Sequence, residues 1–254
     1  NNVALGQNAL LSNTTGNRNI AVGLDALNAN TTGYSNIAIG QDALGDNTNA
    51  YGNLAIGAGA LSVNTIGTAN VALGQSALTS NISGGGLTAA GFTALYRNTA
   101  DSNSAFGFQA GYSITSGTYN TAIGRNTFGS TTALSTGNEN TAVGEGSLFD
   151  NTSGAGNTAL GSGSLSSNTS GSYNIGLGLN TFGTTTNSNT GDHNFAAGEN
   201  ALFNNTTGHD NIAFGRESLK ANTTGYTNVA IAWNALTANT VGIWNIGIGS
   251  GSLE

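Results

Sequence analysis

The sequence predicts an all-β protein, a parallel β-solenoid of about 14.5 coils that forms one elongated repeat domain over residues 1–254. Three observations lead to this fold class. A repeat of 17 residues recurs along the chain, apolar and small residues keep fixed places within it, and no 3.6-residue periodicity of a helix is present. Short repeats that cannot bury an apolar face alone become stable by stacking on their neighbours.

The repeat is defined by an asparagine, which we number position zero. Its consensus is N-x-A-φ-G-x-x-a-L-x-x-N-T-T-G-x-x, where φ is apolar and a is small. The spacing is 17 residues, apart from one interval of 16 and two of 20. The repeats begin at Asn2, Asn19, Asn36, Asn53, Asn70, Leu87, Asn103, Asn120, Asn140, Asn157, Asn174, Asn194, Asn211, Asn228 and Asn245.

Two short strands are expected in each repeat. The segment NxAφG alternates in polarity, which is typical of a strand, and the residues around position eight form the second candidate. Position three is large and apolar except at Ala90 and Ala197, and position eight is Leu or Phe except at Gly111. We therefore expect positions three and eight to line a buried interior.

Glycine and asparagine are expected to shape the turns between the strands. Position four is glycine in every repeat except at Ala232, which indicates a positive φ or a close backbone approach. The segment NTTG consists of residues that favour turns. Stacked asparagines at position zero are expected to bond to one another along the solenoid.

The repeat is least regular over residues 81–117, where three glycines precede Leu87, the one start that is not asparagine. The two 20-residue repeats are expected to carry loop insertions near 131–134 and 184–187. The sequence starts and stops within the pattern, so we expect a segment of a longer fibre.

Composition excludes several classes of partner. The net charge is −7, only 7% of residues are charged, and there is no cysteine. No apolar run approaches the length of about 18 residues that a membrane span needs. The scattered bases form no patch for a phosphate backbone, so we expect neither nucleic-acid binding nor membrane insertion. These bases are Arg18, Arg97, Arg125, Arg216 and Lys220.

The interior expected for such coils is thin, so a second buried face is expected from self-association. The burial of two or three large apolar side chains per coil and the hydrogen bonds between coils together come close to balancing the entropy lost in ordering the coil. Two faces are candidates for contact with another chain. One is position one, which is apolar in residues such as Val3, Ile20 and Ile37, and the other is position two, which is always alanine or glycine.

The segments NVALG, NIAVG, NIAIG, NTAIG and NTAVG resemble the S-V-A-I-G repeats in the head of YadA-type trimeric autotransporter adhesins. Units of N-T-A-φ-G with NTTG turns are also similar to repeats of bacteriophage tail fibres. The resemblance implies a left-handed parallel β-roll that assembles side by side as a homotrimer. It further implies an extracellular localisation, on a cell surface or a virion tail fibre, and binding to host surfaces.

Aromatic side chains in two successive repeats are the candidate receptor- or glycan-binding residues. Phe92 and Phe108 share position five, and Tyr96 and Tyr112 share position nine. Position five is polar or small in most repeats, so we expect it to face outward. Exposed aromatic residues suit sugar rings or a partner surface. The alternative is that they fill a subunit interface or cover a local bend.

Titratable residues give no catalytic or metal site. The pairs Asp192-His193 and His209-Asp210 occupy the same turn of adjacent coils, and four such groups could bind a divalent metal. Asp25 and Asp42 stack at position six, at a spacing that a retaining glycosidase pair would need. We interpret both sets as solvated turn residues. No cofactor, metal or enzymatic activity is expected.

The function predicted is that of an extracellular fibre or adhesin that presents a surface for attachment to a host cell or glycan. An ice-binding solenoid is a second candidate, since threonine recurs at position twelve. Neighbouring threonines in a turn point different ways, however, which argues against a flat ice-binding array. A purely structural extracellular filament is a third candidate. A glycan-cleaving tailspike is a fourth, and it would need a carboxylate cleft.

Overall fold

The computed structural model describes residues 1–183 and 188–254, and this part of the chain forms a parallel β-solenoid without helices. It confirms the predicted fold class, with about 14 coils and a spacing of 17 residues. Each strand has three residues. The strands are β1 (Val3–Leu5), β2 (Ile20–Val22), β3 (Ile37–Ile39), β4 (Leu54–Ile56), β5 (Val71–Leu73), β6 (Thr88–Ala90), β7 (Ser104–Phe106), β8 (Thr121–Ile123), β9 (Thr141–Val143), β10 (Thr158–Leu160), β11 (Ile175–Leu177), β12 (Phe195–Ala197), β13 (Ile212–Phe214), β14 (Val229–Ile231) and β15 (Ile246–Ile248).

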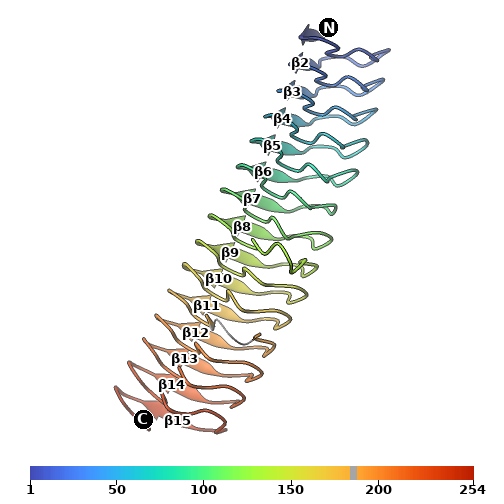
Figure 1. Cartoon of the computed structure of the whole chain (residues 1–254). Helices are drawn as coiled ribbons and strands as arrows, with labels where there is room; N and C mark the ends of the chain where they lie inside the picture. The colour runs from blue at the N-terminus through green and yellow to red at the C-terminus, as the bar shows by residue number, and fades with distance from the viewer. Residues whose placement is uncertain (184–187) are drawn as a thin grey trace. The chain divides into compact units, whose positions relative to one another are not determined.

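The chain divides into two compact units, Asn1–Ala122 and Ile123–Glu254. In the first unit β1 to β7 pair in chain order, and in the second β9 to β15 do the same (Figure 1). Every pairing is parallel and in register, so that equal repeat positions lie side by side. Each repeat position therefore forms a column of side chains along its unit.

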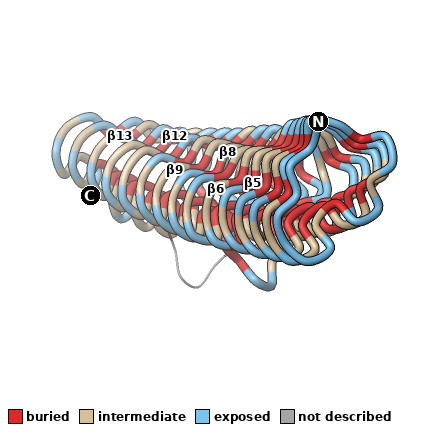
Figure 2. The backbone as a smooth tube through the Cα atoms, turned by 90° about the horizontal axis from the view of Figure 1, so that it is seen from above, coloured by how far each residue is buried: buried red, intermediate tan, exposed pale blue. Residues whose placement is uncertain are grey.

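The central residue of each strand from β2 to β15 is buried, whereas its two neighbours in the strand are half-buried or exposed (Figure 2). Position two is fully buried in the inner strands of both units, as at Ala38 and Ala213. The prediction that position three lines the interior is wrong: Ile39 is 38% exposed, and Phe214 is 55% exposed. Alternation along a strand places positions one and three on the same face, opposite to position two.

The interior beside position two is too crowded for a large side chain. At Gly176, which takes this position on β11, an added Cβ would lie 2.6 Å from both the Ser164 Oγ and the Thr181 Oγ1 atoms. It would also lie 3.2 Å from the Leu165 Cγ atom. At Gly176 even a methyl group would crowd these atoms, and the other strands have only alanine or glycine at this position. The large apolar residues on either side of position two therefore face outward.

Position eight supplies the apolar core, as predicted. Leu27, Leu44 and Leu219 are fully buried. The prediction of a second strand here is wrong, because positions six and eight have left-handed φ values, such as 56° at Asp25 and 51° at Leu27. The backbone turns instead of extending, yet coils remain bonded: the Leu27 amide donates to the Ala43 carbonyl at 3.1 Å.

The glycines at position four have both properties that the sequence indicated. Gly23 has a φ of 134°, and an added Cβ would lie 2.6 Å from the Gly40 carbonyl oxygen in the next coil. The exception, Ala232, adopts the same left-handed side of the map at a φ of 105°. Close backbone approach and positive φ thus both favour glycine in this column.

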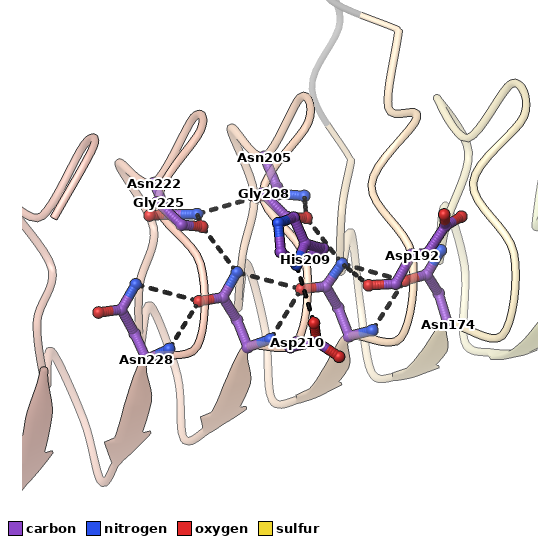
Figure 3. Close-up of polar contacts among 11 residues, drawn as sticks. Asn174, Asp192, Asn205, Gly208, His209, Asp210, Asn222, Gly225 and Asn228 are labelled. Atoms are coloured by element: carbon purple, nitrogen blue, oxygen red, sulfur yellow. Dashed lines mark hydrogen bonds and ion pairs between the residues drawn. The ribbon is translucent and has the colours of Figure 1, made fainter. Parts of the chain in front are cut away.

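Buried asparagines bond to one another along the solenoid, in two columns at positions zero and eleven (Figure 3). The Asn211 amide donates to the Asn194 Oδ1 at 3.0 Å, and its Nδ2 donates to the Gly225 carbonyl at 2.9 Å. In the second column, the Asn222 Nδ2 donates to the Asn205 Oδ1 at 2.9 Å. These bonds satisfy polar groups that would otherwise be costly to bury.

The irregular segment over residues 81–117 keeps the strand register but changes the core. Leu87 takes position zero of its repeat, where the other repeats have asparagine, and it is buried. Its backbone amide still donates to the Asn70 Oδ1 at 2.9 Å. At Gly111 an added Cβ would lie 3.4 Å from the Ile114 Cδ1 atom. Ile114, at position eleven, therefore fills the core space that leucine fills elsewhere.

The first predicted insertion is an exposed loop. Thr131, Thr132 and Leu134 are exposed, and the Ala133 amide donates to the Ser130 Oγ at 3.0 Å. The chain returns to the stack at Ser135, which is buried and accepts a bond from the Asn151 Nδ2 at 3.4 Å. The second predicted insertion, near 184–187, lies outside the described residues.

Candidate functional site

The outward columns at positions one and three form an apolar stripe on each unit, which we call the outer stripe. Large apolar residues occupy most of its places and are half-buried or exposed. Position three holds Leu5, Val22, Ile39, Ile56, Leu73, Ala90 and Phe106 in the first unit, and Ile123, Val143, Leu160, Leu177, Ala197, Phe214, Ile231 and Ile248 in the second.

Position one of the outer stripe changes character within each unit. In the first unit it holds Val3, Ile20, Ile37, Leu54 and Val71 on β1 to β5, then Thr88, Ser104 and Thr121 on β6, β7 and the start of β8. In the second unit it holds Thr141 and Thr158 on β9 and β10, then Ile175, Phe195, Ile212, Val229 and Ile246 on β11 to β15. Each stripe thus has an aliphatic or aromatic stretch of five strands and a shorter stretch with hydroxyl groups.

The outer stripe is large enough to mark a contact surface. Seven strands about 4.8 Å apart make a band roughly 30 Å long and about 10 Å wide, on the order of 300 Å² in each unit. The largest apolar patch on a typical monomer covers about 300–600 Å² and is often functional, so each stripe has the size of such a patch.

The four aromatic residues singled out in the sequence are brought together as two stacked pairs in the first unit. The rings of Phe92 and Phe108 have centroids 5.4 Å apart and planes 11° apart. The rings of Tyr96 and Tyr112 are also 5.4 Å apart, at 9°. Phe92 and Phe108 are exposed, as expected for position five. The Arg97 guanidinium lies 4.9 Å from the centroid of the Tyr112 ring.

This stacking limits what the four rings can bind. Because each ring faces its partner in the next coil, the inner face of every ring is already covered. Similar pairs occur at other turns: Tyr34 stacks on Tyr51 with centroids 4.9 Å apart. Stacking between equal positions is therefore a general result of the repeat, and it adds about 0.5–1.5 kcal/mol for each pair.

The histidine–aspartate turns lie beside the asparagine columns (Figure 3). The His209 Nδ1 lies 2.8 Å from the Asp210 Oδ2, and the His209 ring stacks on Tyr226 with centroids 4.7 Å apart. His193 instead stacks on Tyr173, and the Asp192 Oδ1 accepts a bond from the Ser172 amide at 2.7 Å. Within residues 1–183 and 188–254, no three such groups converge on a metal position.

The stacked aspartates of the first unit are likewise engaged in surface hydrogen bonds. The Asp25 Oδ1 accepts a bond from the Asn8 Nδ2 at 2.9 Å, and the Asp42 Oδ2 accepts one from the Gln41 Nε2 at 3.1 Å. Both residues are half-buried at position six. Each carboxylate is thus bonded to an amide of its own surface.

No protein-family model matches this chain, and no curated protein matches it. The described residues include no helix with the length and apolar character to cross a bilayer. A function for this protein therefore has to be inferred from its own surfaces.

The outer stripe is the feature whose orientation the sequence left open. The strict limit of position two to alanine and glycine was the signal that could have placed it. A column that admits only a methyl group or a hydrogen is crowded on all sides, and that is a property of an interior. The structure accordingly leaves position one, together with position three, on the outside of the coil.

Proposed function

We propose that this protein is a segment of an extracellular fibre or adhesin, with a structural and attaching role rather than a catalytic one. Copies of the chain pack side by side through their outer stripes, as a homotrimer of β-rolls. The remaining faces of each coil stay in contact with solvent and present side chains to a host cell or glycan. The place of action is a cell surface or a virion tail fibre.

The observation that carries this proposal is the apolar character of the outer stripe. Ile56, for example, leaves 39% of its surface exposed in a strand whose own core is already filled. Burying such side chains contributes roughly 25 cal/mol for each Å² of apolar surface removed from water. Identical columns along the strands let identical chains meet in register, because both partners have the same spacing.

Three chains follow from the resemblance of the NxAφG segments to trimeric adhesin repeats. Three stripes that face a common axis are all removed from water at once. The mechanism of attachment is then geometric: three copies of each exposed surface bind together, and multivalency turns weak contacts into a strong one. Hydrogen-bonded coils give the assembly its stiffness.

The ice-binding candidate is weakened by the threonines at position twelve. The Thr31 Oγ1 donates to the Thr48 carbonyl at 3.0 Å, and the Thr206 Oγ1 donates to the Thr223 carbonyl at 2.9 Å. These hydroxyl protons are committed to the stack, so they are not free to donate to an ordered water layer. Absence of thermal hysteresis in ice-growth measurements is the expected result.

The proposal is tested by the solution mass of the protein, measured by light scattering. The wild-type chain is expected at three times its monomer mass, and Ile56→Asp is expected to lower that mass. The matched control is Ile66→Asp in the same repeat, where the side chain is 55% exposed on the NTTG turn. A folded wild-type monomer, or equal loss of mass in both variants, would contradict self-association through the outer stripe.

A further inference from the structure

An open pocket of about 380 Å³ lies in the second unit, on the turns that follow β9, β10 and β11. One side is formed by position five, with Glu145 and Ser162. The other side is formed by positions nine and ten, with Phe149, Asp150 and Ser166. This volume is at the small end of the range for ligand pockets, which suits one or two pyranose rings.

The pocket is hollow beside Gly146, which takes position six of the repeat that begins at Asn140. At Gly163 in the next repeat an added Cβ would clash with the Asn180 Oδ1, so the Asn180 side chain already occupies that space. Gly146 and Gly163 both have a φ of 63°, the left-handed conformation that this position adopts throughout the chain. Later repeats of the same unit place Asn200 and Glu217 there in the same conformation. An added Cβ at Gly146 would meet no atom within 4 Å, so its glycine leaves open space rather than relieving a clash.

The polar side chains of the pocket that are available for a ligand are Asp150, Ser162 and Ser166. The Glu145 carboxylate is paired with Arg125 at 3.2 Å, in an exposed ion pair. Within the described part of the chain, the Asp150 carboxylate and the Ser162 and Ser166 hydroxyls have no hydrogen-bond partner. A carboxylate accepts hydrogen bonds only, whereas a serine hydroxyl both donates and accepts.

We propose that this pocket binds a neutral saccharide. The half-buried Phe149 ring suits the apolar C–H face of a pyranose, and Asp150 accepts hydrogen bonds from two neighbouring sugar hydroxyls. Ser162 and Ser166 complete the polar contacts. Two carboxylates disfavour an anionic ligand, such as a phosphorylated or sialylated sugar, because like charges repel. This inference rests on the proposed attachment function and names the ligand class and the residues.

The pocket uses the same repeat positions as the aromatic pairs of the first unit. There, positions five and nine hold Phe92 with Phe108 and Tyr96 with Tyr112, whose ring faces cover one another. In the second unit, Phe149 is followed at position nine by Ser166 and then by Gly183, so its ring has no aromatic partner in the next coil. An uncovered ring beside free hydroxyls makes the second unit the better sugar site.

The test is binding of the whole chain to a panel of neutral and sialylated mono- and disaccharides, followed by saturation-transfer NMR. Wild-type protein is expected to bind neutral members of the panel. Gly146→Asn fills the hollow with a residue that tolerates positive φ, and it is expected to weaken binding at least tenfold. Phe149→Ala and Asp150→Asn are expected to have similar effects.

Two matched controls keep the result specific. Phe203→Ala removes a phenylalanine from the same repeat position, and Asp46→Asn neutralises an aspartate at position ten of the first unit. Both are expected to bind sugar as wild type does. No binding by the wild-type chain, preference for sialylated sugars, or unchanged binding by Gly146→Asn would overturn the pocket assignment.

Light scattering separates this outcome from that of the proposed function. Gly146→Asn is expected to keep the wild-type mass, because position six is not part of the outer stripe. If the chain assembles but binds no sugar, the pocket inference fails alone. If it binds neutral sugar as a monomer, self-association fails and the pocket stands.

Discussion

Each outer stripe has two kinds of stretch, which differ in the residue type at position one. In the second unit, β9 and β10 have Thr141 and Thr158 at position one, whereas β11 to β15 have aliphatic or aromatic residues there. Strand length, pairing and register are the same in both stretches: Thr158 on β10 pairs directly with Ile175 on β11. The fold of a coil therefore does not depend on an apolar residue at position one.

This difference separates the residues that the coil interior requires from those that only its outer face carries. Position two never departs from alanine or glycine, because the interior of the coil allows nothing larger. Position one accepts a hydroxyl group in either unit without any change of the strand. In the assembly that we propose, its apolar residues on the other strands serve the contact between chains, and that contact is weaker or wetter along the stretches with hydroxyl groups.

The largest effect is expected from the inner side of a coil. Leu219→Ala removes a fully buried position-eight side chain and should lower the free energy of unfolding by about 2–5 kcal/mol. Phe214→Ala, in the same repeat but on the outer stripe, should cost much less in dilute solution. Denaturant unfolding at several protein concentrations measures both.

The concentration dependence is the decisive part of that experiment. The loss from Phe214→Ala should grow with protein concentration, because it removes contacts between chains, whereas the loss from Leu219→Ala should not. Equal losses that ignore concentration would mean that Phe214 acts within its own chain.

A smaller effect, on association, is expected from exchanging an apolar residue and a threonine at the junction of the two kinds of stretch. Ile175→Thr extends the hydroxyl stretch by one strand, and Thr158→Ile shortens it by one. The first should weaken association by about 1–2 kcal/mol for each chain, and the second should strengthen it, since apolar area is lost or gained. Sedimentation equilibrium measures the association free energy of both variants. A change of the same sign in both would contradict a role of position one in association.

The smallest effect concerns position four, which is not part of the outer stripe. Ala232 has a φ of 105°, where every other repeat has glycine. Ala232→Gly should relieve this strain and raise the free energy of unfolding by about 1 kcal/mol. The melting temperature should rise slightly as a result. Association should not change, because Val229 and Ile231 keep their places. A lower melting temperature would show that the alanine methyl packs favourably.

The repeat made most of the fold predictable from sequence. The coil spacing, the parallel register, the turn glycines and the bonded asparagines all follow from local residue chemistry repeated many times. The aromatic pairs of Phe92 with Phe108 and of Tyr96 with Tyr112 were likewise predictable, since equal positions in adjacent coils must lie side by side.

The direction of the strand faces and the course of the chain around position eight were not predictable in the same way. Alternation shows that positions one and three share a face, but it does not show which face is inside. Leucine at a left-handed φ, as at Leu27, contradicts its ordinary preference. The pocket beside Phe149 was also missed, because glycine at Gly146 resembles any other turn glycine until the surrounding space is seen.

The central claim is that equivalent outer-stripe residues of different chains lie close together. The chain has no cysteine, so a single introduced one is unique in each copy. Ile39→Cys places a thiol on the outer stripe, and Thr32→Cys places one on the exposed NTTG turn of the preceding repeat. After treatment with a short bis-maleimide, Ile39→Cys is expected to form covalent dimers on a denaturing gel, and Thr32→Cys to remain monomeric. Cross-linking at Thr32→Cys but not at Ile39→Cys, or at neither, would contradict the account.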